Sequence, residues 1–286
     1  MYIFLFLGPD LSKQLGRWLS AAERSHGPAR AIIVPHAGYT YCGACAAFAY
    51  RQVSPGVVKR IFILGPSHYL QLRGCALSVA DKYKTPLYDL KINAQVNVDL
   101  EKTGHFTWMD MKTDEEEHSI EMQLPYIAKV MEDFKDGFTI VPILVGSLNP
   151  AQEELYGAIL AKYFRDPQNL FVISSDFCHW GQRFSYTYYD RSFSSRIYKS
   201  IKRLDQQGMD VIESLDPSLF TEYLNKYNNT ICGRHSIGVM LNAMKVLEKQ
   251  GYSMSFKFLK YAQSSRCRKM SDSSVSYASG SLLFEY

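Results

Sequence analysis

Three continuous runs of apolar residues occur along the chain, and each is followed by a tight turn and a histidine. They occupy residues 31–36, 60–68 and 170–179. Uninterrupted apolar runs of this length are typical of strands that are buried on both faces at the centre of an α/β sheet. Ligands of such sheets lie beyond the carboxyl ends of the strands. The pattern therefore predicts one site, to which three distant segments each contribute a histidine.

Helical periodicity and further strands fill the rest of the chain. Residues 10–22 place their apolar side chains on one face of a helix, and more helices are expected at 153–164 and onward to about residue 248. Two late strands are expected at 255–261 and 274–284. Because strands and helices alternate without a linker or an internal repeat, we expect an α/β fold with a single domain, in which helices flank a mixed central sheet.

Composition and charge narrow the class of protein. The 286 residues are 47% hydrophobic and 21% charged, which is ordinary for a globular protein with a real core. A net charge of +4 without a long basic run argues against a nucleic-acid-binding protein. No apolar run approaches the roughly 20 residues of a membrane span. The six cysteines are scattered, unlike a secreted disulfide framework, so we expect a cytoplasmic protein in a reducing environment.

His36 and His68 are the first two candidates for a site. His36 is part of Pro-His-Ala-Gly-Tyr, and His68 of Gly-Pro-Ser-His, both directly after a predicted strand. Either histidine alone is more often a hydrogen-bonded structural residue than a functional one. Two of them at the ends of strands that are expected to be neighbours favour metal binding or acid–base chemistry.

Asp176 and His179 follow the third strand, three residues apart. On a helical turn the two side chains would share one face. Asp176 would then fix the tautomer of the imidazole, or His179 would act as a general base. Alternatively, Asp176 caps a helix that follows the strand. Both interpretations can hold together.

A second polar group, Ile231-Cys-Gly-Arg-His235, interrupts a largely apolar helical region. Cys232 is a candidate third metal ligand, because thiolate and imidazole together suit iron, copper or zinc. The alternative is a small buried hydrophobic residue. Arg234 could pair with an anionic ligand, or with a carboxylate such as Asp176.

Two further motifs allow a structural or a functional interpretation. Thr113 is expected to cap a helix, and on this helix His118 and Glu121 have the spacing of a hydrogen-bonded pair that supports a neighbouring site. Cys42 and Cys45 form a C-x-x-C in small, helix-prone sequence. We interpret them as packing residues, with a redox role as the alternative.

The usual nucleotide and hydrolase motifs do not occur in the sequence. It contains no G-x-G-x-x-G after a strand, no Walker loop, no G-x-S-x-G and no H-E-x-x-H. Dinucleotide, nucleoside triphosphate and serine-hydrolase functions therefore lack their usual support.

Several motifs together resemble the Memo family, named for a mediator of ErbB-driven cell motility. The resemblance extends from about residue 9 to the C-terminus, and we expect residues 1–286 to form one Memo-like domain. The motifs are AIIVPHAGYTYCG (31–43), ILGPSH (63–68), EHSIEMQLPY (117–126), SSDFCHWG (174–181), TICGRH (230–235), YAQSS (261–265) and SVSYA (274–278).

This resemblance implies a fold like that of class III extradiol dioxygenases, which hold non-haem iron with two histidines and a carboxylate. It makes His36 and His68 the metal-site imidazoles and places Cys232 where those enzymes have the carboxylate. His179 then resembles their catalytic base, with Asp176 beside it. The family is associated with iron or copper, phosphotyrosine peptides, cytoskeletal signalling and control of cellular oxidants.

The chain departs from these patterns at two places. A thiolate in place of a carboxylate changes the charge and redox behaviour of the site, so dioxygenase activity is not inherited from the fold. Residues 1–8 differ from the Ala-Gly-x-Trp-Tyr-like start of the family. That difference suggests an alternative start or an incomplete gene model.

We rank three functions from the sequence. The first is a signalling protein with a redox-metal pocket of iron or copper, which acts with receptor tyrosine kinases and cytoskeletal regulators in motility and redox homeostasis. The second is a metal-dependent, dioxygenase-like oxidoreductase. The third is an adaptor without metal, in which Tyr39, Tyr41 and Arg234 meet the ring and phosphate of a phosphotyrosine receptor or signalling protein.

Overall fold

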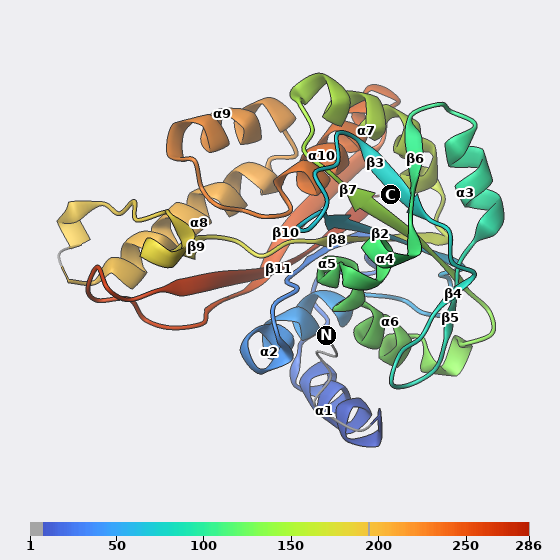
Figure 1. The fold of residues 1–286 in the computed structure, drawn as a ribbon, viewed down its shortest axis with the longest axis horizontal. Helices are drawn as coiled ribbons and strands as arrows, with labels where there is room; N and C mark the ends of the chain where they lie inside the picture. The colour runs from blue at the N-terminus through green and yellow to red at the C-terminus, as the bar shows by residue number, and fades with distance from the viewer. Residues whose placement is uncertain (1–7, 194, 286) are drawn as a thin grey trace.

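A mixed sheet of nine strands organises the molecule (Figure 1). The computed structural model describes residues 8–193 and 195–285. Four neighbouring parallel strands form the centre of the sheet, in the order β1 (Ala31–Val34), β8 (Asn169–Ser174), β2 (Arg60–Pro66) and β7 (Thr139–Val145). The sheet continues antiparallel on both sides, so the α/β fold with a mixed sheet is confirmed.

Further strands extend the sheet on both sides of the four central strands. Next to β1 lies β11 (Ser274–Glu285), which pairs with the edge strand β10 (Ser253–Gln263) and with the short β9 (His179–Trp180). Next to β7 lies β3 (Cys75–Ser78), followed by the edge strand β6 (Phe106–Met109). Two more strands, β4 (Lys82–Tyr83) and β5 (Leu90–Lys91), form a separate ladder.

Helices cover both faces of the sheet. The first face packs against α3 (Ala94–Glu101), α7 (Pro150–Arg165), α8 (Ile197–Glu213) and α10 (Arg234–Lys249), and α9 (Pro217–Tyr227) packs against α8 and α10. The opposite face packs against α1 (Gly8–Ala21), α2 (Tyr39–Tyr50) and α6 (Leu124–Val130), on the lower side of Figure 1. Short helical turns complete the chain, namely α4 (Met111–Glu116), α5 (His118–Glu121), η1 (Glu132–Phe134), η2 (Gln182–Phe184) and η3 (Arg191–Phe193).

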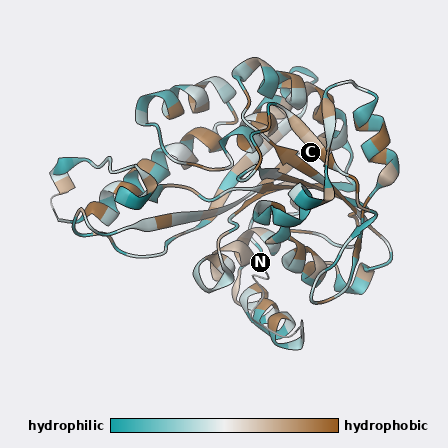
Figure 2. Cartoon of the chain, in the orientation of Figure 1, coloured by the Kyte–Doolittle hydropathy of each residue, from teal (hydrophilic) through white to brown (hydrophobic). Residues whose placement is uncertain are grey.

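The central strands are apolar throughout because both of their faces are covered. Successive side chains of a strand point to opposite faces, so Ile33 and Leu64 join the first core while Ile32 and Ile63 join the second. Figure 2 shows this as a hydrophobic band along the middle of the sheet. The continuous apolar runs of the sequence are therefore explained.

The register of these strands brings their carboxyl ends to one edge. Val34 of β1 lies opposite Ser174 of β8, and Leu64 of β2 lies opposite Ile173. The residues that follow these strands therefore emerge side by side, although 140 positions separate His36 from Asp176.

Two local predictions were wrong. No helix follows Asp176, because the chain continues extended into β9, where it pairs with β11. The helix expected from Thr113 onward is two short helices, capped by Asp110 and Glu117, whose side chains accept from Thr113 N and Ser119 N. Short-range patterns favoured one longer helix, and the break at Glu117 is a tertiary feature.

The remaining helical and strand predictions agree with the structure where it can be compared. The buried face of residues 10–22 is confirmed by Leu11 and Leu15 in α1, and the two late strands are β10 and β11. The atypical start falls mostly on residues 1–7, which lie outside the described residues. Within 8–193 and 195–285, no helix combines the length and the apolar character that crossing a bilayer requires.

Candidate metal centre

His36 is held from two sides where β1 ends. Its side chain is 2% exposed, and its backbone N–H donates to Asp176 Oδ1 at 2.9 Å. Its Nδ1 lies 2.8 Å from Ser174 Oγ, which itself donates to Ser119 O and accepts from Gln123 Nε2. Because the single hydroxyl proton of Ser174 is already donated, the imidazole must carry its proton on Nδ1. Nε2 therefore presents a lone pair to the site.

His68 is held by a carboxylate in the same manner. Glu117, which is 3% exposed, accepts from the His68 backbone at 2.7 Å and lies 2.9 Å from His68 Nδ1. A carboxylate that accepts from one ring nitrogen fixes the tautomer and directs the other nitrogen to a metal. The side chain of His68 is 29% exposed, so this imidazole borders solvent.

Cys232 arrives from the loop between α9 and α10. Its Sγ lies 3.3 Å from His36 Nε2 and accepts from the backbone N–H of Asp176 at 3.1 Å. The next residue, Gly233, donates its N–H to Ser175 Oγ at 3.0 Å. Asp176 thus joins the two segments that supply His36 and Cys232.

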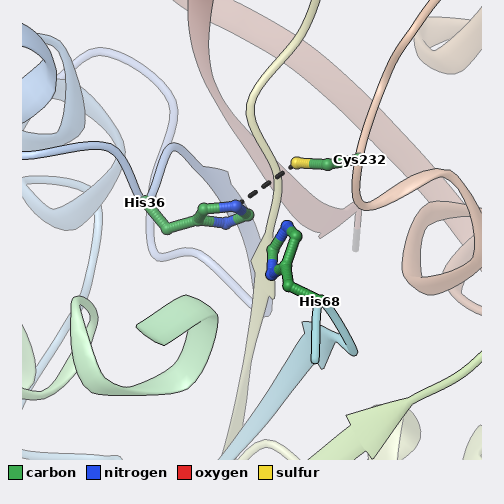
Figure 3. A group of neighbouring side chains, drawn as sticks. All are labelled: His36, His68 and Cys232. Carbon is green, nitrogen blue, oxygen red and sulfur yellow. Dashed lines mark hydrogen bonds between the residues drawn. The ribbon is translucent and has the colours of Figure 1, made fainter. Parts of the chain in front are cut away.

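The three side chains form one compact group (Figure 3). One donor atom from each of His36, His68 and Cys232 lies within 4.8 Å of the others. The two imidazole rings are 5.2 Å apart and nearly perpendicular. Two imidazoles and a thiolate suit iron, copper or zinc, so these residues could hold such an ion.

Burial sets the protonation of this group. Desolvation and the neighbouring histidines hold the pKa of His36 well below its usual value, which keeps its imidazole neutral at pH 7. Burial, with a contribution from the charge of Asp176, raises the pKa of the Cys232 thiol. A bound cation must therefore displace the thiol proton, which is the usual condition for thiolate ligation.

His179 borders the group, but its ring is not oriented by Asp176. Its Nδ1 lies 2.9 Å from Phe177 O and 3.1 Å from Thr230 O, so Nδ1–H donates to backbone carbonyls. Asp176 instead accepts from the backbone of His36. The carboxylate binds there because β9 is extended, which separates the two side chains that a helical turn would have aligned. The Nε2 of His179 retains a lone pair.

The residues predicted to bind a ligand are spread around the centre. Tyr39 packs edge-on against Trp18 and Tyr126, and its hydroxyl donates to Met122 O at 2.7 Å. Tyr41 is 63% exposed. Arg234 donates from Nε to Ile231 O at 2.9 Å, within its own loop.

Glu117 is the functional candidate that sequence reasoning missed. The expected partner of His118 was Glu121, but the carboxylate nearest to His118 Nδ1 is that of Glu117, at 3.5 Å. Glu121 lines a neighbouring cavity together with Glu117. The signal in the sequence was the Glu-His pair at 117–118, which was interpreted as the interior of a helix rather than as a cap.

Cys42 and Cys45 lie within α2 as buried free thiols. Burial raises the pKa of both, that of Cys45 to about 12. Cys42 Sγ lies 3.0 Å from Ala37 O. Because reactive cysteines have lowered pKa values, these surroundings favour the packing interpretation.

We expect Gly233→Ala to lower both stability and metal affinity. A Cβ at this position would overlap the Ser174 carbonyl and the Ser175 side chain, so the loop must move away from β8 and take Cys232 with it. Overpacking of this kind costs about 2 kcal/mol of unfolding free energy. Denaturant unfolding and a metal titration measure the two effects. Gly16→Ala, where the added Cβ meets only Lys129 Cε at 3.5 Å, is the control and should lose neither.

Comparison with known proteins agrees with these motifs. The family model described as "Memo-like protein" matches residues 8–281. The protein MEMO1 of Danio rerio is 62% identical over 276 residues, which cover 96% of this chain and 93% of that protein. Human MEMO1 is 61% identical, with 96% and 92% covered, and the memo-1 homolog of Caenorhabditis elegans is 53% identical, with 96% and 78% covered.

Among solved structures, an uncharacterised protein of Escherichia coli K12 aligns with 86% of this chain and 98% of its own. The TM-score is 0.49 and the sequence identity is 13%.

Proposed function

Because this chain belongs to the Memo family, we propose that it is a signalling protein with a redox-active metal centre. The metal is iron or copper, and its ligands are His36, His68 and Cys232. The protein acts in the cytoplasm, in receptor-tyrosine-kinase and cytoskeletal signalling, cell motility and redox homeostasis. The signalling part rests on the family resemblance, and the metal centre rests on the chain's own residues.

The observation that carries the metal centre is the convergence of three donor atoms from three distant segments. They lie within 4.8 Å of one another, and each imidazole is already oriented through its other nitrogen, by Ser174 or by Glu117. Such supporting contacts are characteristic of metal-binding histidines. A purely structural histidine would not need its second nitrogen directed at a thiol.

Each surrounding group has a definite role in this proposal. Ser174 and Glu117 hold the two Nδ1 protons, so that both Nε2 atoms are available. Asp176 binds the backbone of His36 and donates its own N–H to Cys232 Sγ. His179 retains a lone pair with which to accept a proton from a bound ligand. Iron or copper, when bound, would supply one-electron chemistry.

Metal content tests the proposal directly. We expect protein purified under anaerobic, reducing conditions to bind one Fe(II) or Cu(I) ion per chain in equilibrium titrations. Reducing conditions matter because oxidation of the Cys232 thiol would remove a ligand. Elemental analysis after dialysis measures the stoichiometry, and a chain that retains neither metal above the level of a denatured control contradicts the proposed centre.

A further inference from the structure

We propose that His68, Glu117 and His118 form a second cation site. It shares His68 with the group that contains Cys232, so only one of the two sites can be occupied at a time. The proposal concerns divalent cations of intermediate softness, such as Zn²⁺, Fe²⁺ and Co²⁺. It uses the opposite nitrogen of His68, so it stands or falls independently of whether iron or copper occupies the group that contains Cys232.

The geometry centres on one carboxylate oxygen. Glu117 Oε1 lies 2.9 Å from His68 Nδ1 and 3.5 Å from His118 Nδ1, and one donor atom of each residue lies within 4.8 Å of the others. Ligands of a tetrahedral zinc ion, with bonds of about 2.0–2.1 Å, are about 3.4 Å apart. The two separations from Glu117 Oε1 are therefore within about half an ångström of this spacing, and the donors of the two imidazoles lie within 4.8 Å of each other.

His118 supplies the second observation. Its Nδ1 is shielded from solvent and has no hydrogen-bond partner among the described residues. A polar atom buried in this way costs free energy unless something pairs with it. The ring lies close to two other imidazoles, since its centre is 4.5 Å from that of His68 and 5.5 Å from that of His36. A cation between His118 and Glu117 would satisfy the unpaired nitrogen.

The two donor sets differ in softness. The group with Cys232 offers two imidazoles and a thiolate, which favours soft ions such as Cu(I). The group formed by His68, Glu117 and His118, called the outer group from here on, offers two imidazoles and a carboxylate. This set of ligands suits non-haem iron and zinc. Glu117 keeps its hydrogen bonds from Ser119 N and His68 N in either case, so the carboxylate stays in place.

Sharing of His68 makes the two sites exclusive. A neutral imidazole has one lone pair and one proton. At present Nδ1 carries the proton and faces Glu117, which leaves the lone pair on Nε2. For a cation to bind at Nδ1, that proton must leave to solvent, and Nε2 must take one up. His68 then no longer offers a lone pair to an ion beside Cys232.

One member of the outer group, formed by His68, Glu117 and His118, lies beside a cavity, and the other two are partly exposed. A cavity of about 610 Å³ borders Glu117, and its wall includes Met111, Asp114, Ile120 and Glu121. His68 and His118 have 29% and 28% of their side chains exposed, whereas His36 is buried. A cation from solvent therefore reaches the group formed by His68, Glu117 and His118 before it reaches the group that contains His36 and Cys232.

Cobalt(II) binding in a variant without the inner ligands tests the inference. We expect the His36→Gln/Cys232→Ser double variant to bind one Co²⁺ per chain with d–d absorption and no sulfur-to-cobalt band. Adding His118→Gln should weaken this binding about 100-fold, since loss of a ligand exceeds the 10–100-fold effect of a supporting residue. Adding Glu117→Gln should do the same. Adding His235→Gln is the control, because His235 also pairs with a glutamate, Glu153, at 2.7 Å but belongs to no group of three donors within residues 8–193 and 195–285.

The possible results separate this inference from the proposed function. If the folded double variant binds no Co²⁺, or if His118→Gln leaves its binding unchanged, the second site is rejected. If wild-type protein binds Co²⁺ without a sulfur-to-cobalt band, the cation occupies the site formed by His68, Glu117 and His118, and the centre at Cys232 is tested separately by the Cu(I) titration. Circular dichroism of each variant establishes that it is folded. A fully occupied wild type with two Co²⁺ per chain would overturn the mutual exclusion.

Discussion

Replacing Cys232 by serine is expected to lower the affinity for Cu(I) by about 100-fold or more. The thiolate is the only soft donor of the group, and a serine hydroxyl remains protonated at neutral pH. Even supporting residues around metal ligands contribute 10–100-fold to affinity, so loss of a ligand should cost at least the upper end of that range. Competition with a Cu(I) chelator under anaerobic conditions measures the change.

Cys75→Ser is the matched control for this experiment. Cys75 is buried in β3, on the far side of β2 and β7 from β1, and among the residues that the structure describes it belongs to no group of three possible ligands. We expect it to lose some stability, because a hydroxyl replaces a buried thiol, but to keep its Cu(I) affinity. Equal affinities of wild-type protein and the Cys232→Ser variant would show that the thiolate is not a ligand.

The largest effect on stability is expected for Phe171→Ala. Phe171 lies on β8 and is fully buried, and its ring is stacked between Phe62 and Phe164, with centroid distances of 4.5 and 3.5 Å. Removing a buried aromatic ring leaves a cavity that typically costs about 3–5 kcal/mol. The lost stacking adds to this. Denaturant unfolding should show a strongly lowered midpoint.

We expect the Phe171→Ala substitution to disturb the candidate metal centre as well, because the same strand leads to residues that hold its ligands. β8 ends at Ser174, which holds His36, and Asp176 follows two residues later and contacts both His36 and Cys232. Phe134→Ala provides the comparison, because Phe134 is 41% exposed and should change stability by only about 0.5 kcal/mol. Similar losses in the two variants would mean that the stack at Phe171 does not support the core.

The central strands could be predicted from sequence for a simple reason. A strand covered on both faces must be apolar at every position, and this pattern is local, so β1, β2 and β8 were recognisable without any contact. The carboxyl ends of parallel strands in one sheet lie along the same edge, and this holds for β1 and β2 although β8 lies between them. That rule placed His36 and His68 together before any distance was known.

Glu117 and the conformation after Asp176 were not predictable in the same way. Capping rules favoured Thr113, because they consider three or four neighbouring residues and not the carboxylate's contact with His68, 49 positions away. Likewise, Asp176-Phe-Cys-His179 permits a helical turn, and only pairing of β9 with β11 makes it extended. In both cases a long-range contact outweighed a weak local preference.

The sequence by itself determined that the chain forms an α/β fold, which residue types supply the chemistry, and that His36 and His68 each follow a buried strand. The expectation that these two strands are neighbours was wrong, because β8 lies between β1 and β2. Tertiary structure alone decided which atoms face one another. It placed Cys232 Sγ, in the loop after α9, 3.3 Å from His36 Nε2. It also directed the Asp176 carboxylate to the backbone N–H of His36 rather than to the ring of His179. The physical reason is that periodicity and composition are local properties of the chain. A donor set, in contrast, depends on side-chain positions within a few tenths of an ångström, which only packing between distant segments can fix.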